Sequence, residues 1–520
     1  MRRKKFNITG LCIPEYHYMA DVSGKVHKII RDYIDQEEYF TINRARQYGK
    51  TTMLYLLRDA LKDDYVILNL SFEGKEEYFT SLKTFAAGLN FSFYQALKRD
   101  FSALAQIFSE KIEAALAMEE FGSRITLLCE RAERKVILMI DEVDKAADYE
   151  VFLSFLGMLR ERYLNRRIGG DATFSSVILA GVHDVKNLKM KIRPEQGNNY
   201  NSPWNVAAVF DVDMSLSVAE IESMLREYEN DMHTGMDMTE MADGLYKYTG
   251  GYPFLVSCLC KIMDERPLSW DKFGLRAAVK ELLRENNTLF DDVIKNIQIH
   301  LQFASLAEKI IVQGAQVPFE IRNPDIQLGV MYGIFREQDG KTAVSNIIFE
   351  TLILNYFISV RSTGALTSSH YVDKNTYVTD GKLDMEKVLV RFSEFMKSEY
   401  RDEDGSFIEQ QGRLLFLSFL RPIINGTGHY AVEPQTRKNT RMDIEVFYGK
   451  QEFVIELKIW HGEQYEQRGF DQLIRYLEAR GIKKGYMLSF CDNRKEPRKG
   501  QTFVYRDHEI FEVIVAYRAR

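Results

Sequence analysis

The sequence predicts an α/β protein of several domains, with a parallel sheet in its first half, helices in its middle and a second, smaller α/β domain at its end. Three observations predict this architecture. The 520 residues exceed one ordinary core, since domains commonly hold about 100–200 residues. A loop ending in Gly-Lys-Thr joins a strand-like run to a helix-like run near the N-terminus. A charged hairpin lies between two strand-like runs near the C-terminus.

Composition excludes several classes of protein. Hydrophobic residues make up 45% of the chain and charged residues 28%, as in ordinary globular proteins. The net charge of -6 gives no global attraction to nucleic acid, so any such contact must be local. No stretch reaches the roughly 18 continuous apolar residues of a membrane-spanning helix. Five scattered cysteines without C-x-x-C spacing fit a reducing compartment, and we expect a cytoplasmic protein with no membrane partner.

The first elements are the strand-like EYFTIN and the helix-like TTMLYLLRDALKD, joined by a loop. This loop, within INRARQYGKTTML, ends in Gly49-Lys50-Thr51, the close of the phosphate-loop pattern G-x-x-x-x-G-K-[ST]. In such loops backbone N–H groups cradle phosphate, the lysine reaches the outer phosphates and the hydroxyl ligates magnesium. Arg44 replaces the first glycine, which leaves open a working site, a degenerate site or a chance match. The candidate nucleotide-binding residues here are Arg46, Gly49, Lys50, Thr51 and Thr52.

The next strand-like runs are YVILNLSFE (65–73) and KVILMIDEVD (135–144). The second is apolar until its end, which predicts a strand buried on both faces of a parallel sheet, with ligands at its carboxyl edge. Asp141 and Glu142 fall at that edge. In P-loop ATPases an aspartate there holds the magnesium shell, and the following glutamate activates the attacking water. Together with the upstream loop, the pair predicts one site for ATP and Mg²⁺, with Thr51 and Asp141 on the metal and Glu142 catalytic; solvated acids at a strand end are the alternative.

Two further strand-like runs follow, SSVILAGVHDV (175–185) and NVAAVFDVDM (205–214). His183 and Asp184, at the end of the first, either sense the γ-phosphate or cap a turn. YTGGYPFLVSCL (248–259) predicts a corner between two helices, because two glycines follow one helix-like run and a proline begins the next.

FNITGLCIPEYHYMAD, INRARQYGKTTML, VILMIDEVD, AGVHDVKNL and TGGYPF, in this order, resemble the bacterial AAA-like, STAND-related ATPases that carry a nuclease-like domain at the C-terminus. The resemblance implies an ATPase core over 1–235 and a helical lid over 236–300, with G-Y-P similar to the G-x-P motif of STAND lids. It implies that replacing the first loop glycine, here by Arg44, is common in the family. It also implies that Tyr18 and Asp21 wall the nucleotide pocket.

The middle of the chain predicts a winged-helix-like domain over 301–360. FASLAEKIIVQG and the LGVMYGIF region are helix-like, and Asp339-Gly340 is a hairpin turn signal. Such a domain either binds DNA or clamps its neighbours, and no basic cluster here favours DNA. The aperiodic segment that follows is rich in Ser, Thr and Gly and predicts a linker over 361–378.

Near the C-terminus, RMDIEVFYGKQEFVIELKIW contains two strand-like runs around a Gly-Lys turn. That turn places Asp443 directly opposite Glu456, and Lys458 projects from the same face as Glu456 because strand side chains alternate. Two carboxylates about 5 Å apart repel each other unless a cation lies between them. Magnesium would resolve this conflict.

The D…E-x-K arrangement resembles that of the PD-(D/E)XK nucleases, whose restriction-endonuclease-like α/β fold we expect for residues 379–520. The resemblance implies that the two acids bind Mg²⁺, while the lysine orients or deprotonates the attacking water. GFDQLIRYLEARG is similar to the Q-x-x-x-Y helix of RecB-like members, and SFIEQQGRLLFLSFL holds an acid that some members contribute. The implied catalytic residues are Asp443, Glu456, Lys458, Gln472 and Glu409. An ordinary charged hairpin is the alternative.

The sequence therefore predicts an ATP-binding protein and ATPase coupled to a magnesium-dependent nuclease domain that acts on DNA, with ATP regulating the nuclease. Residues 431–500 hold 14 Lys or Arg against 11 Asp or Glu, a local basic excess that favours phosphate contact without sequence reading. The rival function is a nucleotide-gated switch or scaffold whose C-terminal domain binds nucleic acid or protein without cleavage. Either function is compatible with a homo-oligomer.

Overall fold

The protein divides into two compact units in its computed structural model. The first unit comprises Met1–Tyr246, Gly251–Trp270 and Met331–Gly333, and the second comprises the rest. The predicted domain ranges stay predictions. His183, Asp184 and most of the basic loop at 494–500 lie outside the described residues. The described residues are 3–146, 150–182, 204–311, 315–365, 376–399, 409–424, 427–432, 443–459, 463–491 and 500–516.

The first unit is built around a four-stranded sheet in the order β1-β4-β3-β2, in which all neighbouring strands are parallel. Its strands are β1 (Tyr39–Asn43), β2 (Val66–Ser71), β3 (Val136–Asp141) and β4 (Ser176–Gly181), as the sequence predicts. The strand predicted at 205–214 is wrong, because only Ala208 pairs there, in an isolated parallel bridge to Phe40. Parallel strands in this order, with a loop and helix after β1 and acids after β3, match the P-loop fold.

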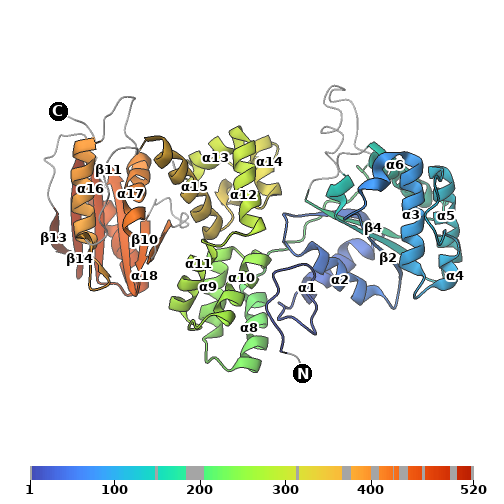
Figure 1. The fold of residues 1–520 in the computed structure, drawn as a ribbon, viewed down its shortest axis with the longest axis horizontal. Coiled ribbons are helices and arrows are strands. Elements are labelled where there is room, and N and C mark those ends of the chain that lie inside the picture. The colour runs from blue at the N-terminus through green and yellow to red at the C-terminus, as the bar shows by residue number, and fades with distance from the viewer. Residues whose placement is uncertain are drawn as a thin grey trace. The chain divides into compact units, whose positions relative to one another are not determined.

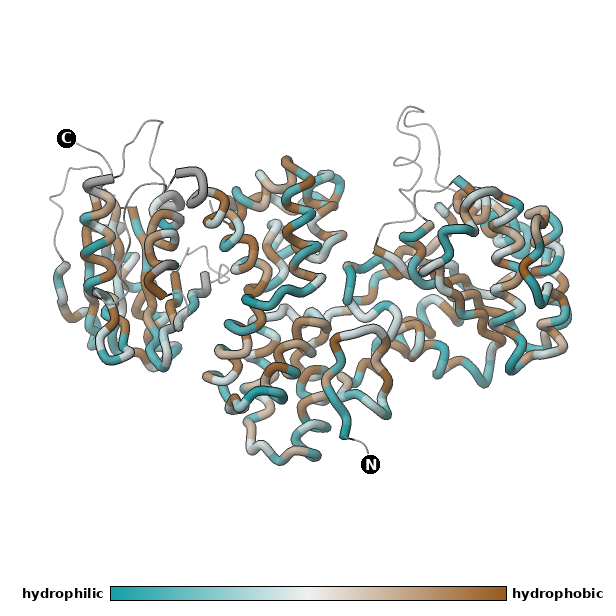
Figure 2. The backbone as a smooth tube through the Cα atoms, viewed as in Figure 1, coloured by the Kyte–Doolittle hydropathy of each residue, from teal (hydrophilic) through white to brown (hydrophobic). Residues whose placement is uncertain are grey.

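Helices cover both faces of this sheet (Figure 1). On β3, Ile137 and Met139 pack with α1 (Ser23–Ile29) and α2 (Lys50–Leu61), whereas Leu138 and Ile140 pack with the helices on the other face. Because both faces are buried, the strand is apolar up to Asp141. Figure 2 shows brown, hydrophobic backbone in the region of this sheet. The other face is covered by α3 (Leu82–Leu97), α5 (Met118–Arg131) and α6 (Glu150–Arg167). Shorter elements are η1 (Ile30–Ile34), η2 (Glu76–Thr80), α4 (Ser102–Ala105) and η3 (Val143–Ala146).

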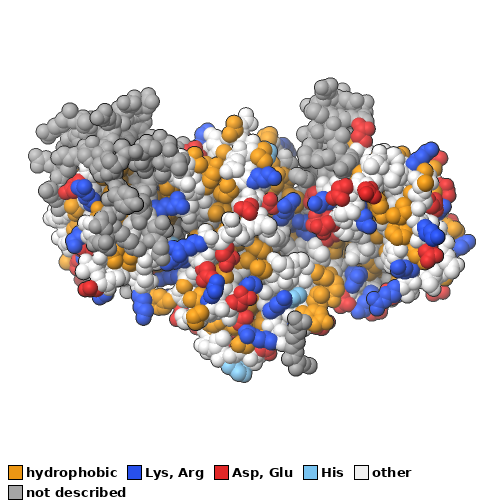
Figure 3. All heavy atoms as spheres, viewed as in Figure 1, with side chains coloured by type: hydrophobic (Ala, Val, Ile, Leu, Met, Phe, Trp, Pro, Cys, Tyr) orange, Lys and Arg blue, Asp and Glu red, His pale blue; other side chains and the backbone are white. Residues whose placement is uncertain are grey.

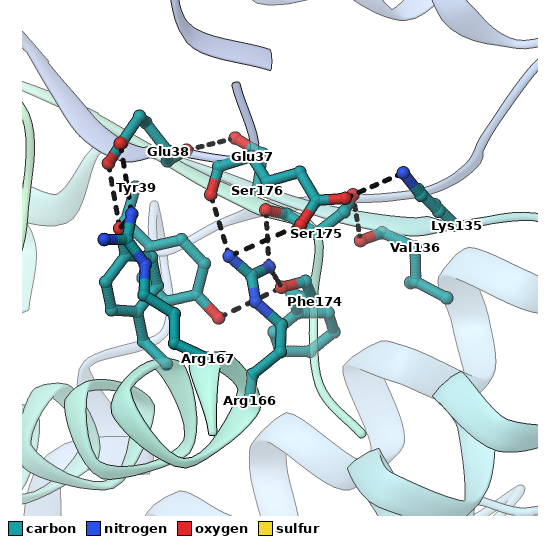
Figure 4. A network of polar contacts seen from close by, with 11 residues as sticks. Glu37, Glu38, Tyr39, Lys135, Val136, Arg166, Arg167, Phe174, Ser175 and Ser176 are labelled. Atoms are coloured by element: carbon teal, nitrogen blue, oxygen red, sulfur yellow. Dashed lines mark hydrogen bonds and ion pairs between the residues drawn. The ribbon is translucent and has the colours of Figure 1, made fainter. Parts of the chain in front are cut away.

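A polar network fastens the amino ends of β1 and β4 (Figure 4). The Arg166 guanidinium on α6 donates to the carbonyl groups of Glu37, Phe174 and Ser175, at 2.9, 2.5 and 2.8 Å. Lys135 pairs with the Glu37 carboxylate at 2.7 Å. The phosphate loop leaves the opposite end of β1, so this network stabilises the sheet and stands apart from the candidate site.

Three helices follow the sheet: α8 (Val218–Met232), α9 (Met238–Thr249) and α10 (Pro253–Glu265). The predicted corner lies between α9 and α10, where Gly251 has a φ of 76°. The Leu216 amide donates to the Gly251 carbonyl at 2.7 Å, and a Cβ at position 251 would lie 2.1 Å from the Leu216 carbonyl oxygen. Only glycine allows this approach.

The second unit begins with helices and a hairpin. Asp339 and Gly340, with φ of 51° and 75°, form the two-residue turn between β5 and β6, which confirms the predicted hairpin. The helix α15 continues through 361–365, where the linker is predicted to begin, and 366–375 lie outside the described residues. The elements are α11 (Lys272–Leu282), α12 (Thr288–Ile299), α13 (Leu301–Ile311), α14 (Pro324–Met331), β5 (Phe335–Gln338), β6 (Lys341–Val344) and α15 (Ile347–Ala365).

The chain ends in a six-stranded mixed sheet, in the order β13-β14-β12-β11-β10-β9. Strands β9, β10 and β11 are antiparallel, whereas β11, β12 and β14 are parallel. The strands are β9 (Gly428–Val432), β10 (Asp443–Tyr448), β11 (Gln451–Ile459), β12 (Lys484–Cys491), β13 (Gln501–Tyr505) and β14 (His508–Ala516). A small hairpin, β7 (Val378–Thr379) and β8 (Lys382–Leu383), precedes them.

Three helices pack on this second sheet. Leu473 and Leu477 of α18 join Val454 and Met487 in a core on one face, and Phe392 of α16 contacts Phe416 of α17 and Phe490 of β12. The helices are α16 (Met385–Glu399), α17 (Glu409–Ile424) and α18 (Glu463–Arg480). Among all the described helices, none is long and apolar enough to cross a bilayer.

Candidate functional site

The loop between β1 and α2 holds the predicted lysine with its own backbone. Gly49 caps α2 with a left-handed φ of 80°, and Lys50 is the first helical residue. The Lys50 side chain is buried, and its ammonium group donates to the carbonyl oxygens of Arg44 and Ala45 at 3.0 and 2.9 Å. The loop therefore curls around the group that the phosphate-loop pattern assigns to the outer phosphates.

The acidic strand meets this loop at one hydroxyl group. Thr51 Oγ1 donates to Asp141 Oδ2 at 2.6 Å, and the other Asp141 oxygen accepts the Glu142 amide at 2.9 Å. Residues predicted from two distant motifs thus form one polar cluster. Strands β1 and β3 are not neighbours, because β4 lies between them. All three strands are parallel, so their carboxyl ends lie at the same edge of the sheet, where the two motifs meet.

Burial and neighbouring charge perturb this cluster. Burial lowers the pKa of Lys50, and the carboxylates of Asp144, Glu142 and Asp141 oppose this shift. Burial first, and then the Asp141 charge, raise the pKa of Glu142. Glu142 also has a φ of 56°, a strained conformation for a residue with a side chain. Strain and shifted titration together are typical of functional positions.

The two remaining predicted loop residues connect the loop to its surroundings. The Arg46 side chain is exposed, and its carbonyl oxygen accepts the Tyr252 hydroxyl at the start of α10. The Thr52 hydroxyl accepts the Cys12 amide at 3.2 Å. The corner between α9 and α10 and the N-terminal segment therefore both contact the loop.

The resemblance implies that Tyr18 and Asp21 wall the nucleotide pocket, which stays a prediction, and the structure gives both side chains contacts with the protein. The Tyr18 hydroxyl donates to Asp231 on α8 at 3.0 Å, and its buried ring packs against Phe6 and Tyr228. Asp21 accepts the Ser23 amide at 3.0 Å, at the start of α1. Their side chains thus fasten the N-terminal segment to α8 and start a helix.

The predicted hairpin near the C-terminus has the predicted register. Asp443 pairs with Glu456 across β10 and β11, with Gly449 and Lys450 in the turn. The Asp443 side chain lies outside the described part of the chain. Glu456 is completely buried. The Lys458 ammonium lies 2.9 Å from Glu456 Oε1.

Helix α18 completes this cluster. The Lys458 ammonium donates to Gln472 Oε1 at 3.3 Å, so three of the implied catalytic side chains meet. A Cβ at Gly469 would lie 3.2 Å from Lys458 Cγ, which means that a glycine lets the helix pack closely on the lysine. Glu409 is the first residue of α17, and its side chain lies outside the described part.

A second set of charges, missed in the sequence, holds the other end of α18. Arg480 pairs with Glu445 on β10, and Arg276 of α11 lies 2.8 Å from Glu452 on β11. The Arg276 guanidinium also stacks over Phe447 at 4.2 Å. These partners are far apart in sequence, and no local pattern marks them.

Beyond Lys458, buried polar residues continue across the sheet on the same face. Ser489 on β12 pairs in register with Lys458, and its hydroxyl donates to Glu512 of β14 at 2.6 Å. Glu512 is level with Met487, which in turn is level with Glu456. An acid inside the apolar run FEVIVA was the available signal for this position.

Both clusters offer the oxygen donors that Mg²⁺ prefers. The Thr51 hydroxyl and the Asp141 carboxylate lie together at one site, and Glu456 faces the Asp443 position at the other. Among the side chains that the structure describes, no group of three or more His, Cys, Asp or Glu is gathered as a metal site. The oxygen donors of Thr51 and Asp141 therefore suit Mg²⁺, whereas at the hairpin Glu456 is the one of the two predicted acids whose side chain the structure describes.

No protein-family model matches the chain, and no curated protein matches it. Solved structures similar to part of it include a Walker-type ATPase of Pyrococcus abyssi, with 11% identity over 67% of this chain and 99% of that chain and a TM-score of 0.46. The Aeropyrum pernix ORC1 protein in complex with DNA has 12% identity, coverage of 67% and 96%, and a TM-score of 0.31. The ADP form of the ORC2 protein of that organism has 10% identity, the same coverage and a TM-score of 0.35. The candidate nucleotide site rests on the strand order and the contacts described above.

Proposed function

We propose that the first unit binds ATP with Mg²⁺ at the loop between β1 and α2 and hydrolyses it. The observation that carries this proposal is the 2.6 Å contact between the Thr51 hydroxyl and the Asp141 carboxylate, which joins the phosphate loop to the acidic strand. Support also comes from the burial of Lys50, whose charge then faces little competing water.

The residues divide the chemistry among them. The backbone N–H groups at the start of α2 bind the phosphates, and Lys50 exchanges the loop carbonyls for phosphate oxygens. The oxygen of the attacking water bonds to the γ-phosphorus while Glu142 accepts a proton from that water. The bond between this phosphorus and the bridging oxygen then breaks and releases ADP. A bound Mg²⁺ would supply charge neutralisation for the phosphates, held by Thr51 and Asp141.

Calorimetric titration of ATP tests this proposal. Lys50→Ala removes a charged donor, so we expect ATP affinity to fall about 10- to 100-fold. Lys62→Ala is the matched control, since Lys62 follows the other end of α2, is exposed and pairs with Asp59. Equal ATP affinity in wild type and Lys50→Ala would remove the loop from the site.

We further propose that the C-terminal sheet is a magnesium-dependent nuclease that acts on DNA and is regulated by ATP. Support comes from the Lys458 ammonium, which lies between Glu456 and Gln472 on one buried face. Among the side chains coloured in Figure 3, Lys and Arg are interspersed with Asp and Glu, so DNA contact would be local.

In this proposal Asp443 and Glu456 would hold Mg²⁺, which supplies a more acidic water and a polarised phosphodiester. Lys458 orients or deprotonates that water, and Gln472 fixes the lysine through its side-chain oxygen. Attack on phosphorus breaks one phosphorus–oxygen bond of the backbone, and the leaving oxygen takes up a proton.

A cleavage assay on single-stranded, duplex and branched DNA, with and without ATP, tests the nuclease. We expect Lys458→Ala to lower the cleavage rate by about 100-fold or more. Lys450→Ala, at the exposed turn of the same hairpin, should cut like the wild type. Cleavage that survives Lys458→Ala refutes this mechanism, and no cleavage of any substrate would instead favour a nucleotide-gated switch or scaffold.

A further inference from the structure

One peptide group links the phosphate loop to the turn after the acidic strand. The carbonyl oxygen of Gly181, the last residue of β4, accepts the Arg44 amide at 3.1 Å. The amide on the other side of the same peptide bond, that of Val182, donates to both carboxylate oxygens of Asp144, at 2.8 and 2.6 Å. The start of the loop and the Asp144 carboxylate therefore share one rigid, planar group.

Asp144 can approach this peptide group because residue 181 is a glycine. A Cβ there would lie 2.8 Å from Asp144 Oδ1 and 2.7 Å from Val143 Cγ2, closer than real contacts allow. Gly181 belongs to strand β4, so its role is to leave space beside Asp144 rather than to adopt an unusual backbone conformation.

The Asp144 charge also acts on the phosphate-loop lysine. Lys50 is buried in this loop, and Asp144 carries the opposite charge beside the first residue of the loop. The carboxylate thus has two effects: it fixes the loop through a peptide group, and it balances the loop's buried cation.

We propose that Asp144 is a positioning residue for ATP turnover, which holds the phosphate loop in place against Asp141 and Glu142. This inference rests on the proposed ATP hydrolysis. Without Asp144 the loop can still bind phosphates through its backbone and Lys50, but the γ-phosphate is no longer held in line with the water beside Glu142. Misplacement by about 1 Å can lower a rate about 100-fold.

The test compares ATP affinity by calorimetry with kcat by phosphate release at saturating ATP. We expect Asp144→Ala to lower kcat about 100-fold and Asp144→Asn, which keeps one acceptor oxygen, to lower it about tenfold. Gly181→Ala should resemble Asp144→Ala, because its Cβ displaces the carboxylate without altering charge. ATP affinity should stay within about threefold of wild type in all three. Asp59→Asn, an exposed acid on α2, is the control and should match wild type in both.

Each outcome decides the inference. Wild-type kcat in Asp144→Ala and Gly181→Ala overturns it, and so does a loss of affinity with kcat preserved. If Asp144→Ala does not fold, Asp144→Asn and Gly181→Ala carry the test, with retained ATP binding as the sign of a native site. A wild type that binds ATP without any turnover refutes the proposed hydrolysis, and this inference with it, but leaves ATP binding standing. A wild type that does not bind ATP refutes the whole proposed function, whereas wild-type turnover that the variants retain overturns this inference alone.

Discussion

At the scale of single residues, the contacts of Arg44 show why the loop can lack the first glycine of the phosphate-loop pattern. Its guanidinium donates to the carbonyl oxygens of Asn43 and Val212 at 2.9 and 2.8 Å and stacks over Phe210 at 5.4 Å. The left-handed positions of the loop are Gln47 and Gly49. Because Arg44 needs no left-handed backbone, its side chain is free to anchor the segment beside β1.

Restoring the glycine with Arg44→Gly should therefore lower the free energy of unfolding. Burial lowers the pKa of the Arg44 guanidinium. In the variant, two partly buried carbonyl groups would lose their donor. We expect the unfolding free energy to fall by about 2–4 kcal/mol, as measured by denaturant unfolding. The neighbouring Arg46→Gly, at an exposed side chain, should change it by less than about 1 kcal/mol. Equal stability of Arg44→Gly and wild type would show that the guanidinium anchors nothing.

At the scale of elements, the hydrophobic pattern and the turn residues predict most of the strands and turns on which the candidate sites lie. The four strands of the parallel sheet, the corner before α10 and the register of the hairpin at Asp443 all follow from local sequence. The expected strand at 205–214 fails because Phe210 and Val212 are buried by side-chain packing and not by strand pairing. An apolar run indicates burial, and it does not specify a hydrogen-bonded partner.

What sequence could not predict are contacts between elements that are distant along the chain. In the sequence, Asp144 is only a third acid near the end of a strand. Its contact with the Val182 amide depends on the position of β4 beside β3. Ser489 and Glu512 meet only because β12 and β14 are neighbours. Such pairs depend on strand order, which periodicity leaves open.

At the scale of the whole molecule, two compact units imply two unfolding events. Each unit has its own core, with Leu57 fully buried in the first and Leu473 fully buried in the second. Leu57→Ala and Leu473→Ala should each destabilise their own unit by about 2–5 kcal/mol. A calorimetric scan of the two variants thus identifies which transition belongs to which unit.

With the transitions assigned, Mg-ATP should raise mainly the transition of the first unit. At 100 times its dissociation constant a ligand of the native state adds about 2.7 kcal/mol of stability, which corresponds to about 5–10 °C for a unit of this size. At the same ATP concentration Lys50→Ala should reduce this stabilisation to about 0.4–1.4 kcal/mol, because it weakens the binding about 10- to 100-fold and leaves the core intact. Any increase in the midpoint temperature of the second transition measures how much ATP binding stabilises the second unit, which contains Lys458. A shift confined to the second transition would place the ATP site in the second unit and contradict the assignment to the loop at Lys50.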